Sequence, residues 1–510
     1  MSAWRRACLG VVAAVAVAAC GGGQTNTVQG PAPHGNVLQI AGPGDPDSLD
    51  PMGGGSGFDV TYLYQIYEPL INLDPNTNKL LPGLATSWNW VGANKLTLRL
   101  KLRQGVTFQD GTPFNAEAAK ASLDHARTFK TWPDLVPVTS VNVVDPYTID
   151  INVGQPYSPL PALLTWRGGM MESPTAIQKY GSDIGRHPVG AGPFAFQSWK
   201  AGDSIVLTKF KDYYQADQVH LSGLNFRIIP DQTAQINALR AGQLDVGGLA
   251  DLSNLPTVQN ARNLNVRVSS TTALSIVTTN NKAAPFNNVL VRRAAQMAID
   301  RKALAIAANG KGQVNKGIGG PACQYVPPGY WPYSKDLKCW NYDPAQAKQL
   351  LAQAGYPNGV TVQLCTIQGA PTTIPVIEKQ QMAKAGFNVQ ISVEPVNSCL
   401  SKMFNATGNM VQIGWTALAD PYQTYATMFG PTTSFGPYPG VPELLAKAAA
   451  SYTQDQQQAV YHQLNKTLFD LAPSMPLYYN VTAGITNKRV SGVENTKIVF
   501  VTYYKHARVQ

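Results

Sequence analysis

Charged side chains are scarce in this chain. Asp, Glu, Lys and Arg make up 14% of its 510 residues, well below the quarter that is usual for soluble globular proteins. Uncharged polar residues fill the gap, as they commonly do in exported proteins. The formal net charge is +10, but the positive side chains are scattered and no basic run is interleaved with aromatic residues. A nucleic-acid partner is therefore not expected.

Catalytic sequence motifs are also missing. The chain contains neither HExxH nor GxSxG, the motifs typical of metalloproteases and serine hydrolases. Its histidines are scattered, and each is expected to be a surface or core residue: His34, His125, His187, His220, His462 and His506. The glycine-rich run near residue 54 has neither GxxxxGK nor GxGxxG spacing, so no phosphate-binding loop is predicted. We expect no enzyme activity, catalytic residue, metal ion or cofactor.

Long apolar runs are limited to the N-terminus. Two arginines precede the apolar residues 7–19, a run too short to span a bilayer as a permanent helix. This layout predicts a secretory signal over residues 1–19. The letters "VAAC" resemble the bacterial lipobox, so Cys20 is expected to be lipidated and to anchor the exported protein to the outer face of the cytoplasmic membrane. Residues 20–35 would form a flexible tether, and the alternative is a chance cysteine after an ordinary signal.

Few cysteines remain after the lipidation site, and their number is even. They are Cys323, Cys339, Cys365 and Cys399, which suggests disulfides in an oxidising compartment. Three pairings are possible. We favour Cys323–Cys339 and Cys365–Cys399, because each pair closes a local loop. A zinc site is the alternative, but no CxxC pair exists and no histidine is near in sequence.

The hydrophobic pattern predicts a mixed α/β protein. Alternating residues predict a strand within residues 95–108 and a hairpin over 141–153, while helical spacing is found at residues 60–73, 115–129 and 285–310. Asn115 is the expected N-cap of its helix. Residues 360–395 read as strand, helix and strand, a crossover that makes a parallel pair. This unit would place Cys365 and Cys399 near the same strand ends, which supports their pairing.

Eight segments, taken in order, resemble one family. They are "DSLDP", "YEPLINLDPNTNKLLPGLATSWN", "GVTFQDGTPFNAEAAKASL", "GAGPFAFQSW", "ALRAGQLDV", "PFNNVLVRRAAQMAIDRKAL", "YDPAQAKQLLAQAGYPNG" and "APSMPLYY". Together they are similar to the peptide/nickel/opine family of extracellular solute-binding proteins, which serve ABC importers (solute-binding protein family 5). Most of these motifs are structural, so they indicate the fold and do not name the ligand.

The resemblance implies a two-lobed α/β fold of the periplasmic-binding-protein type, the type II or Venus-flytrap fold. Lobe I would hold residues 36–60, 165–270 and 485–510, with a small subdomain, residues 61–164, inserted in it. Lobe II would hold residues 271–484. A monomer would capture a peptide or a related small solute between its lobes and deliver it to permease subunits with an ATPase. The alternative is an envelope lipoprotein that uses this fold for cell-wall regulation or as a chaperone.

The resemblance also suggests ligand contacts in three places. The glycine-rich loop would expose backbone groups around Gly53, Ser56, Gly57 and Phe58, although a plain flexible loop is the alternative. Trp415 and Thr416 would form the cleft wall, with core packing as the alternative for the tryptophan. A third group consists of Tyr479 and Asn480, and we add Asp420 and Tyr422 as candidates.

One position departs from the family pattern. Binders that anchor a peptide amine place a carboxylate three residues after the cleft tryptophan, and here that position is Leu418. Asp420 matches the later Asp-Pro of the motif, which is turn chemistry. Binding of free dipeptides is therefore in doubt. Longer or blocked peptides, glycopeptides, haem-like ligands, nickel chelates and other solutes stay open.

Overall fold

The computed structural model describes residues 35–55, 57–129, 135–249, 252–368, 370–416, 419–430, 435–498 and 500–510. The predicted signal, the lipidation site Cys20, Ser56 of the glycine-rich loop and Leu418 lie outside the described residues, so what was expected of them stays a prediction. Within the described residues, no helix has both the length and the apolar character needed to cross a membrane.

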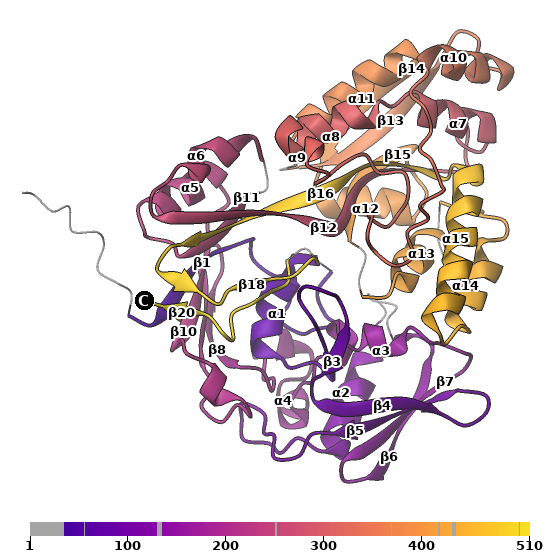
Figure 1. Cartoon of the computed structure of the whole chain (residues 1–510). Helices are drawn as coiled ribbons and strands as arrows, with labels where there is room; N and C mark the ends of the chain where they lie inside the picture. Colours follow the sequence, from indigo (N-terminus) through magenta and orange to yellow (C-terminus); the bar gives the residue numbers. More distant parts are fainter. Residues whose placement is uncertain are drawn as a thin grey trace, which may run out of the picture.

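A mixed sheet of ten strands runs through the molecule (Figure 1). From one edge to the other its strands are β14 (Phe387–Glu394), β13 (Val360–Ile367), β15 (Met410–Thr416), β12 (Leu264–Thr279), β16 (Ser474–Asn487), β11 (Val246–Leu249), β1 (Val37–Gly42), β10 (Gly223–Ile228), β9 (Ser204–Lys209) and β8 (Phe194–Lys200). We keep the names lobe I, subdomain and lobe II for the residue ranges expected above.

The long strands β12 and β16 connect the lobes. They pair antiparallel from Leu264 opposite Asn487 to Thr278 opposite Ser474, with register shifts after Ser270 and Ser275. The expected lobe boundaries, 270/271 and 484/485, fall inside these two strands. Figure 1 shows both strands running from the β11 end of the sheet to the β15 end. Each strand therefore contributes residues to both lobes.

Helices cover both faces of the sheet in lobe II (Figure 1). One face carries α7 (Val289–Met297), α8 (Arg301–Asn309), α9 (Lys311–Asn315), α10 (Pro344–Gln353) and α11 (Thr373–Lys384). The other carries α12 (Val396–Phe404), α13 (Tyr422–Phe429), α14 (Val441–Ala449) and α15 (Gln454–Leu471). Because side chains alternate along a strand, Val277 of β12 enters the first core and its neighbour Ile276 the second.

Lobe I contains four helices within the described residues. They are α1 (Val60–Ile66), α4 (Pro174–Tyr180), α5 (Gln232–Arg240) and α6 (Leu255–Gln259), and α1 is preceded by a 3₁₀ turn, η1 (Gly57–Asp59). Helix α1 packs into the same core as Leu38, Ile40 and Phe226, so it lies with lobe I although the expected boundary assigns it to the subdomain. Two short pairs close the chain: β17 (Val490–Ser491) with β20 (Arg508–Val509), and β18 (Glu494–Asn495) with β19 (Thr502–Tyr503).

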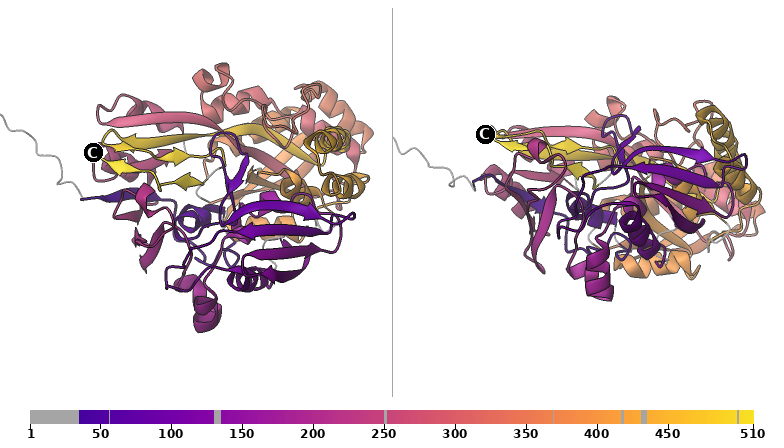
Figure 2. Two further views of the ribbon diagram at one scale, coloured as in Figure 1. Left: turned by 60° about the horizontal axis from the view of Figure 1, so that its bottom comes forward. Right: turned by 90° about the horizontal axis from the view of Figure 1, so that it is seen from below.

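The subdomain has its own four-stranded sheet. Its order is β4 (Ala85–Val91), β5 (Thr97–Leu102), β7 (Thr148–Val153) and β6 (Val138–Asp145), with α2 (Ala116–Ala126) packed on it, α3 (Leu160–Leu163) beyond, and the pair β2 (Ile71–Leu73) with β3 (Leu80–Pro82) beside it. The predicted N-cap is confirmed, since the Asn115 side chain accepts from the Ala118 N–H at 3.0 Å. The subdomain packs beside the helices of lobe II (Figure 2). At this contact the Ser158 N–H donates to Ala449 O, at the end of α14, at 2.8 Å.

Several secondary-structure predictions are confirmed and two are wrong in extent. The hairpin β6–β7 and the parallel pair β13–β14 around α11 form as expected. Residues 285–310, expected as one helix, divide into α7 and α8, because the Asp300 side chain accepts from the Ala303 N–H at 3.0 Å and caps a new helix. The helix expected over 60–73 ends at Ile66, and residues 71–73 form β2.

The Leu-Asp-Pro segment organises the glycine-rich loop. Asp50 Oδ1 accepts from the N–H groups of Met52 at 2.8 Å and Gly53 at 3.1 Å. Arg167, fully buried, donates to Pro51 O at 2.8 Å and lies 3.5 Å from the Asp59 carboxylate. Burial raises the pKa of Asp59 to about 6, while Arg167 opposes that rise. These contacts therefore hold the glycine-rich loop against the body of lobe I.

Both predicted disulfides form. Cys323 joins Cys339, and Cys365 of β13 joins Cys399 of α12. The second bridge is buried and ties β13, the strand next to the edge strand β14, to α12.

Removing the second bridge tests its contribution to stability. Cys365→Ala/Cys399→Ala frees a loop with a sequence separation of 34, and we expect the free energy of unfolding to fall by about 3–4 kcal/mol. Urea unfolding of the variant and of the parent, both with Cys323–Cys339 intact, measures this. Coinciding unfolding midpoints would contradict the prediction.

Candidate functional site

A cavity of about 820 Å³ lies between the two lobes. Lobe I supplies residues 40–43 at the end of β1, Phe58 of η1 and all of β11. Lobe II supplies residues 307–309 at the end of α8 and residues 370–375 around the start of α11. The site therefore lies beyond the carboxyl ends of β1, β11 and β13, where α/β sheets commonly bind ligands. Its volume suits a small solute or a short peptide.

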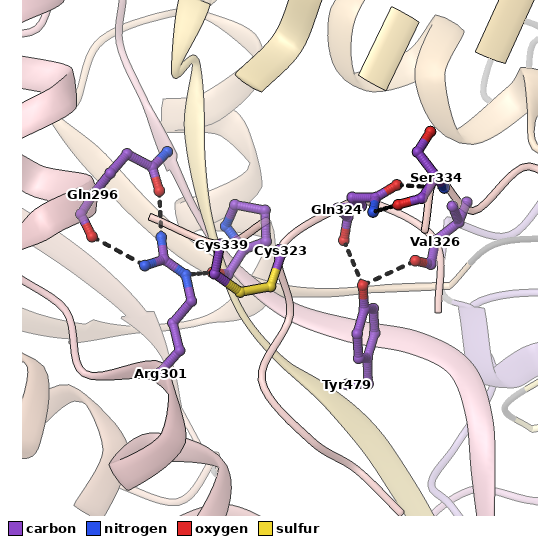
Figure 3. The surroundings of a disulfide bond; sticks show 9 residues. Gln296, Arg301, Cys323, Gln324, Val326, Ser334, Cys339 and Tyr479 are labelled. Carbon is purple, nitrogen blue, oxygen red and sulfur yellow. Dashed lines mark hydrogen bonds between the residues drawn. A yellow bond between two sulfur atoms is a disulfide. The ribbon is translucent and has the colours of Figure 1, made fainter. Parts of the chain in front are cut away.

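Strand alternation decides which side chains of β16 reach the cavity. Tyr478, Asn480 and Thr482 are lining residues, and Val481 also borders the cavity while it packs against the core of buried residues around α5. Tyr479 lies between them and is buried on the other side of the strand, where its hydroxyl donates to Gln324 O at 3.2 Å or Val326 O at 2.9 Å (Figure 3). Asn480 is thus placed for ligand contact, whereas Tyr479 holds the segment after Cys323.

The same reasoning applies to β15. Gln412, Ile413 and Gly414 line the cavity, and the Ile413 side chain packs in the second lobe II core. Trp415, expected at the cleft wall, is not among the lining residues of this cavity. Its ring packs with the second lobe II core, near Met428 and Phe429 of α13. Core packing, the alternative held open for Trp415, describes its position in this structure, and its role as a ligand contact stays a prediction.

The edges of β13 and β15 separate at the cavity. These strands pair in parallel at only two positions, Leu364 with Met410 and Cys365 with Val411. Beyond them β13 continues along β14, and β15 continues along β12 as far as Thr416. In the part of the chain that the structure describes, no strand pairs with β15 on its β13 side after Val411. The backbone at residues 412–414 therefore presents a strand edge to the cavity.

Charged side chains are missing from the described lining. The polar groups there are hydroxyls and amides, among them Gln235, Asn309, Gln412, Asn480 and Asn495. A carboxyl group does stand behind the wall, because Gln412 Nε2 donates to Glu378 Oε1 at 2.9 Å. Glu378 is 2% exposed, and burial raises its pKa to about 8. This carboxyl is therefore mostly protonated and uncharged at neutral pH.

The remaining expected contacts lie outside this lining. Gly53 N–H is engaged by Asp50, and Gly57 at the start of η1 is exposed. Thr416 ends β15 opposite Ala273. Tyr422 packs edge-on against Tyr157 of the subdomain, with ring centroids 5.5 Å apart. Of the predicted contacts within the described residues, Phe58 and Asn480 line the cavity.

Asp420 forms a buried turn. Its Oδ1 accepts from the Tyr422 N–H at 2.8 Å and from the Tyr461 hydroxyl at 3.3 Å. Burial raises the pKa of Asp420 to about 6. The Asp-Pro pair leads directly into α13, whose N-cap is Pro421. The geometry agrees with the turn role inferred from the sequence.

One group of titratable side chains resembles a metal-binding set. His125 Nε2 lies 3.3 Å from Asp50 Oδ2 and 3.6 Å from Glu172 Oε2. Burial and the nearby Asp50 raise the pKa of Glu172 well above its usual range. The contact between His125 of α2 and Asp50 connects the Leu-Asp-Pro loop to this helix, which accounts for the cluster without a metal ion. The second candidate set contains Cys365 and Cys399, whose thiols are consumed by the disulfide.

Sequence reasoning missed much of the cavity wall. Residues 307–309 and 370–375 come together only through the fold. A signal existed for the second segment, because it follows the carboxyl end of a predicted parallel strand. Alternation along residues 410–416 could also have separated Gln412 and Gly414 from Trp415.

A cavity enclosed by two lobes that share long crossing strands is the architecture of a solute-binding protein. The sequence model of bacterial extracellular solute-binding proteins, family 5, matches residues 79–436, and the chain belongs to this family. It is 28% identical over 465 residues to the glutathione-binding protein GsiB of Shigella flexneri, a match covering 87% of this chain and 89% of that protein. The same identity and coverage hold for GsiB of Escherichia coli K12.

Solved structures share the fold. DppA of Helicobacter pylori in complex with the peptide STSA has a TM-score of 0.81 at 24% identity, covering 93% of this chain and 98% of that chain. NikZ of Campylobacter jejuni in complex with Ni(L-His) has a TM-score of 0.81 at 20% identity, covering 93% and 99%. The two-lobed α/β fold expected from the sequence is thus confirmed.

The buried carboxyl behind the cavity wall predicts a pH dependence. Because the pKa of Glu378 is raised to about 8 from an ordinary 4.5, its contribution to stability is complete below pH 4.5 and is lost as the pH rises through 8. Glu378→Gln is uncharged throughout. The difference in unfolding free energy between this variant and the parent should therefore change by a few kcal/mol in favour of the variant between pH 5 and pH 9.

Urea unfolding at pH 5, 7 and 9 checks this. The control is Glu394→Gln, because Lys402 and Ser398 hold the pKa of Glu394 low, at about 2. The difference in unfolding free energy between this variant and the parent should therefore stay constant from pH 5 to pH 9. A constant difference between Glu378→Gln and the parent would show that the carboxyl is not held protonated.

Proposed function

We propose that this chain is the substrate-binding lipoprotein of an ABC importer. It captures a peptide or a related small solute in the cavity and delivers it to permease subunits with an ATPase. The observation that carries this proposal is a cavity lined by both lobes and by the strands that connect them. Family membership supports it, because the relatives are named as binding proteins.

A peptide-like ligand fits the separated strand edges. An extended chain can pair with the free edge of β15 through backbone hydrogen bonds, which do not depend on side-chain identity. The aromatic residues Phe58, Tyr478 and Tyr504 also line the cavity and can receive apolar groups. GsiB is named for glutathione, and the DppA structure holds a tetrapeptide, so peptide-like ligands occur among the relatives.

Closure about β12 and β16 follows from the shared lining. A ligand that contacts residues of both lobes gains those contacts together only when the lobes are close, so it shifts the population toward the closed form. We place the hinge at the boundaries 270/271 and 484/485, inside the crossing strands. The closed form is the one that the permease would recognise.

Ligand contacts are assigned by this geometry. We propose Phe58 and Asn480, together with Gln412, as direct contacts. Gly53, Ser56, Gly57, Trp415, Thr416, Asp420, Tyr422 and Tyr479 were also predicted from the sequence as ligand contacts, and they stay proposals. We also propose that the protein is a monomer without enzyme activity, held in the cell envelope by lipid at Cys20.

Native mass spectrometry and a thermal-shift screen test the proposed function. The purified mature protein should retain a small ligand, or its melting temperature should rise with peptides, since a ligand that binds the folded state stabilises it by mass action. No retained ligand and no shift with any peptide or solute would favour the non-transport alternative.

Asn480 and its neighbour Tyr479 on β16 offer a matched pair of variants. Asn480→Ala should weaken binding of a stabilising peptide at least tenfold and leave the melting temperature nearly unchanged, because Asn480 faces the cavity. Tyr479→Phe should keep the affinity and lower the unfolding free energy by about 1 kcal/mol, because it removes one buried hydrogen bond. Calorimetric titration measures the affinity of both variants, and urea unfolding measures their stability. Loss of affinity in Tyr479→Phe together with loss of stability in Asn480→Ala would exclude the proposed orientation of β16.

A further inference from the structure

We propose that this cavity selects an uncharged peptide, one with both termini blocked or joined and without ionised side chains. The inference rests on the proposed function and adds the class of substrate. Its basis is the wall itself: among the described residues that line the cavity, none is Asp, Glu, Lys, Arg or His, although charged residues make up 14% of the chain.

An ionised peptide would find no partner in this wall. A free peptide carries an α-ammonium and an α-carboxylate, and enclosing either one without an opposite charge costs several kcal/mol. A blocked terminus needs only ordinary hydrogen bonds. The hydroxyl and amide groups of the wall supply these without a charge penalty.

Two amide side chains are oriented to accept from ligand N–H groups. Asn309 donates through its amide nitrogen to Gly319 O at 2.7 Å and Tyr479 O at 2.9 Å. Gln412 donates through its amide nitrogen to Glu378 Oε1 at 2.9 Å. The two N–H groups of Asn309 and one N–H group of Gln412 are engaged by protein acceptors, and both amide oxygens can accept from a ligand. Acceptors of this kind match the N–H groups of a peptide or a terminal amide.

Helix ends at the cavity do not replace ionic partners. The last turn of α8 and the first turn of α11 both reach the lining. Each helix end carries a partial charge of about half an elementary charge, and the two ends have opposite signs. They favour the dipoles of amide groups, and they offer less than a full opposite charge to an ammonium or a carboxylate.

Four forms of one tetrapeptide test the inference. The sequence Ser-Thr-Ser-Ala is prepared with both termini free, with an acetylated N-terminus, with an amidated C-terminus, and with both ends blocked. Calorimetric titration of the mature protein at pH 7 should show the doubly blocked form binding at least tenfold tighter than the free form, with the singly blocked forms between them.

The outcomes separate the two proposals. If the free form binds as tightly as the blocked form, the uncharged-substrate inference is overturned and the proposed function stands. If no form of the peptide binds, peptide capture fails and the inference fails with it. A singly blocked form that matches the doubly blocked one would show that the other terminus is accepted as an ion, which also overturns the inference.

Added charge provides a second measurement. Asn480→Asp places a carboxylate in the wall with little change of shape, and it should shift the preference at least tenfold toward the form with a free amino terminus. Asp251, outside the described residues, stands between the lining residues Leu249 and Leu252 in sequence. Asp251→Asn is the control and should leave the order of the four affinities unchanged. A changed order in this variant would overturn the inference.

Discussion

The antiparallel pairing of β12 with β16 is the constraint on which the structure depends. One register, from Leu264 opposite Asn487 to Thr278 opposite Ser474, fixes the position of both lobes. It also sets which side chains face the cavity, because moving a strand by one residue exchanges its two faces. Ser275, Tyr478 and Asn480 reach the cavity for this reason, and the same strands also connect the two lobes.

Separation of β13 from β15 gives the cavity its chemical character. Strand edges that stop pairing expose backbone groups, and the described residues of the surrounding wall add amides, hydroxyls and aromatic rings without ionisable acids or bases. Glu378, the carboxyl bound to Gln412, is buried and mostly uncharged at neutral pH. The site is therefore suited to hydrogen bonding and apolar contact.

Local patterns in the sequence predicted local structure well. Period-two alternation located the β6–β7 hairpin, and the pairing of Cys365 with Cys399 followed from the β13–α11–β14 unit. The long helix expected over 285–310 failed at Asp300, because a side-chain cap outweighed continuous helical spacing. The site was harder to predict. Trp415 and Asn480 were both chosen, but the face that each presents depends on strand pairing between residues far apart in the chain, which no local pattern contains.

A crystal structure of the mature protein with the doubly blocked tetrapeptide tests the central claim most directly. The account predicts an extended peptide along residues 412–414 of β15, in contact with Asn480 and with Phe58 of lobe I, and the two lobes closed around it. A peptide bound against Trp415 on the α13 face of the sheet, or held by one lobe alone, would contradict the account.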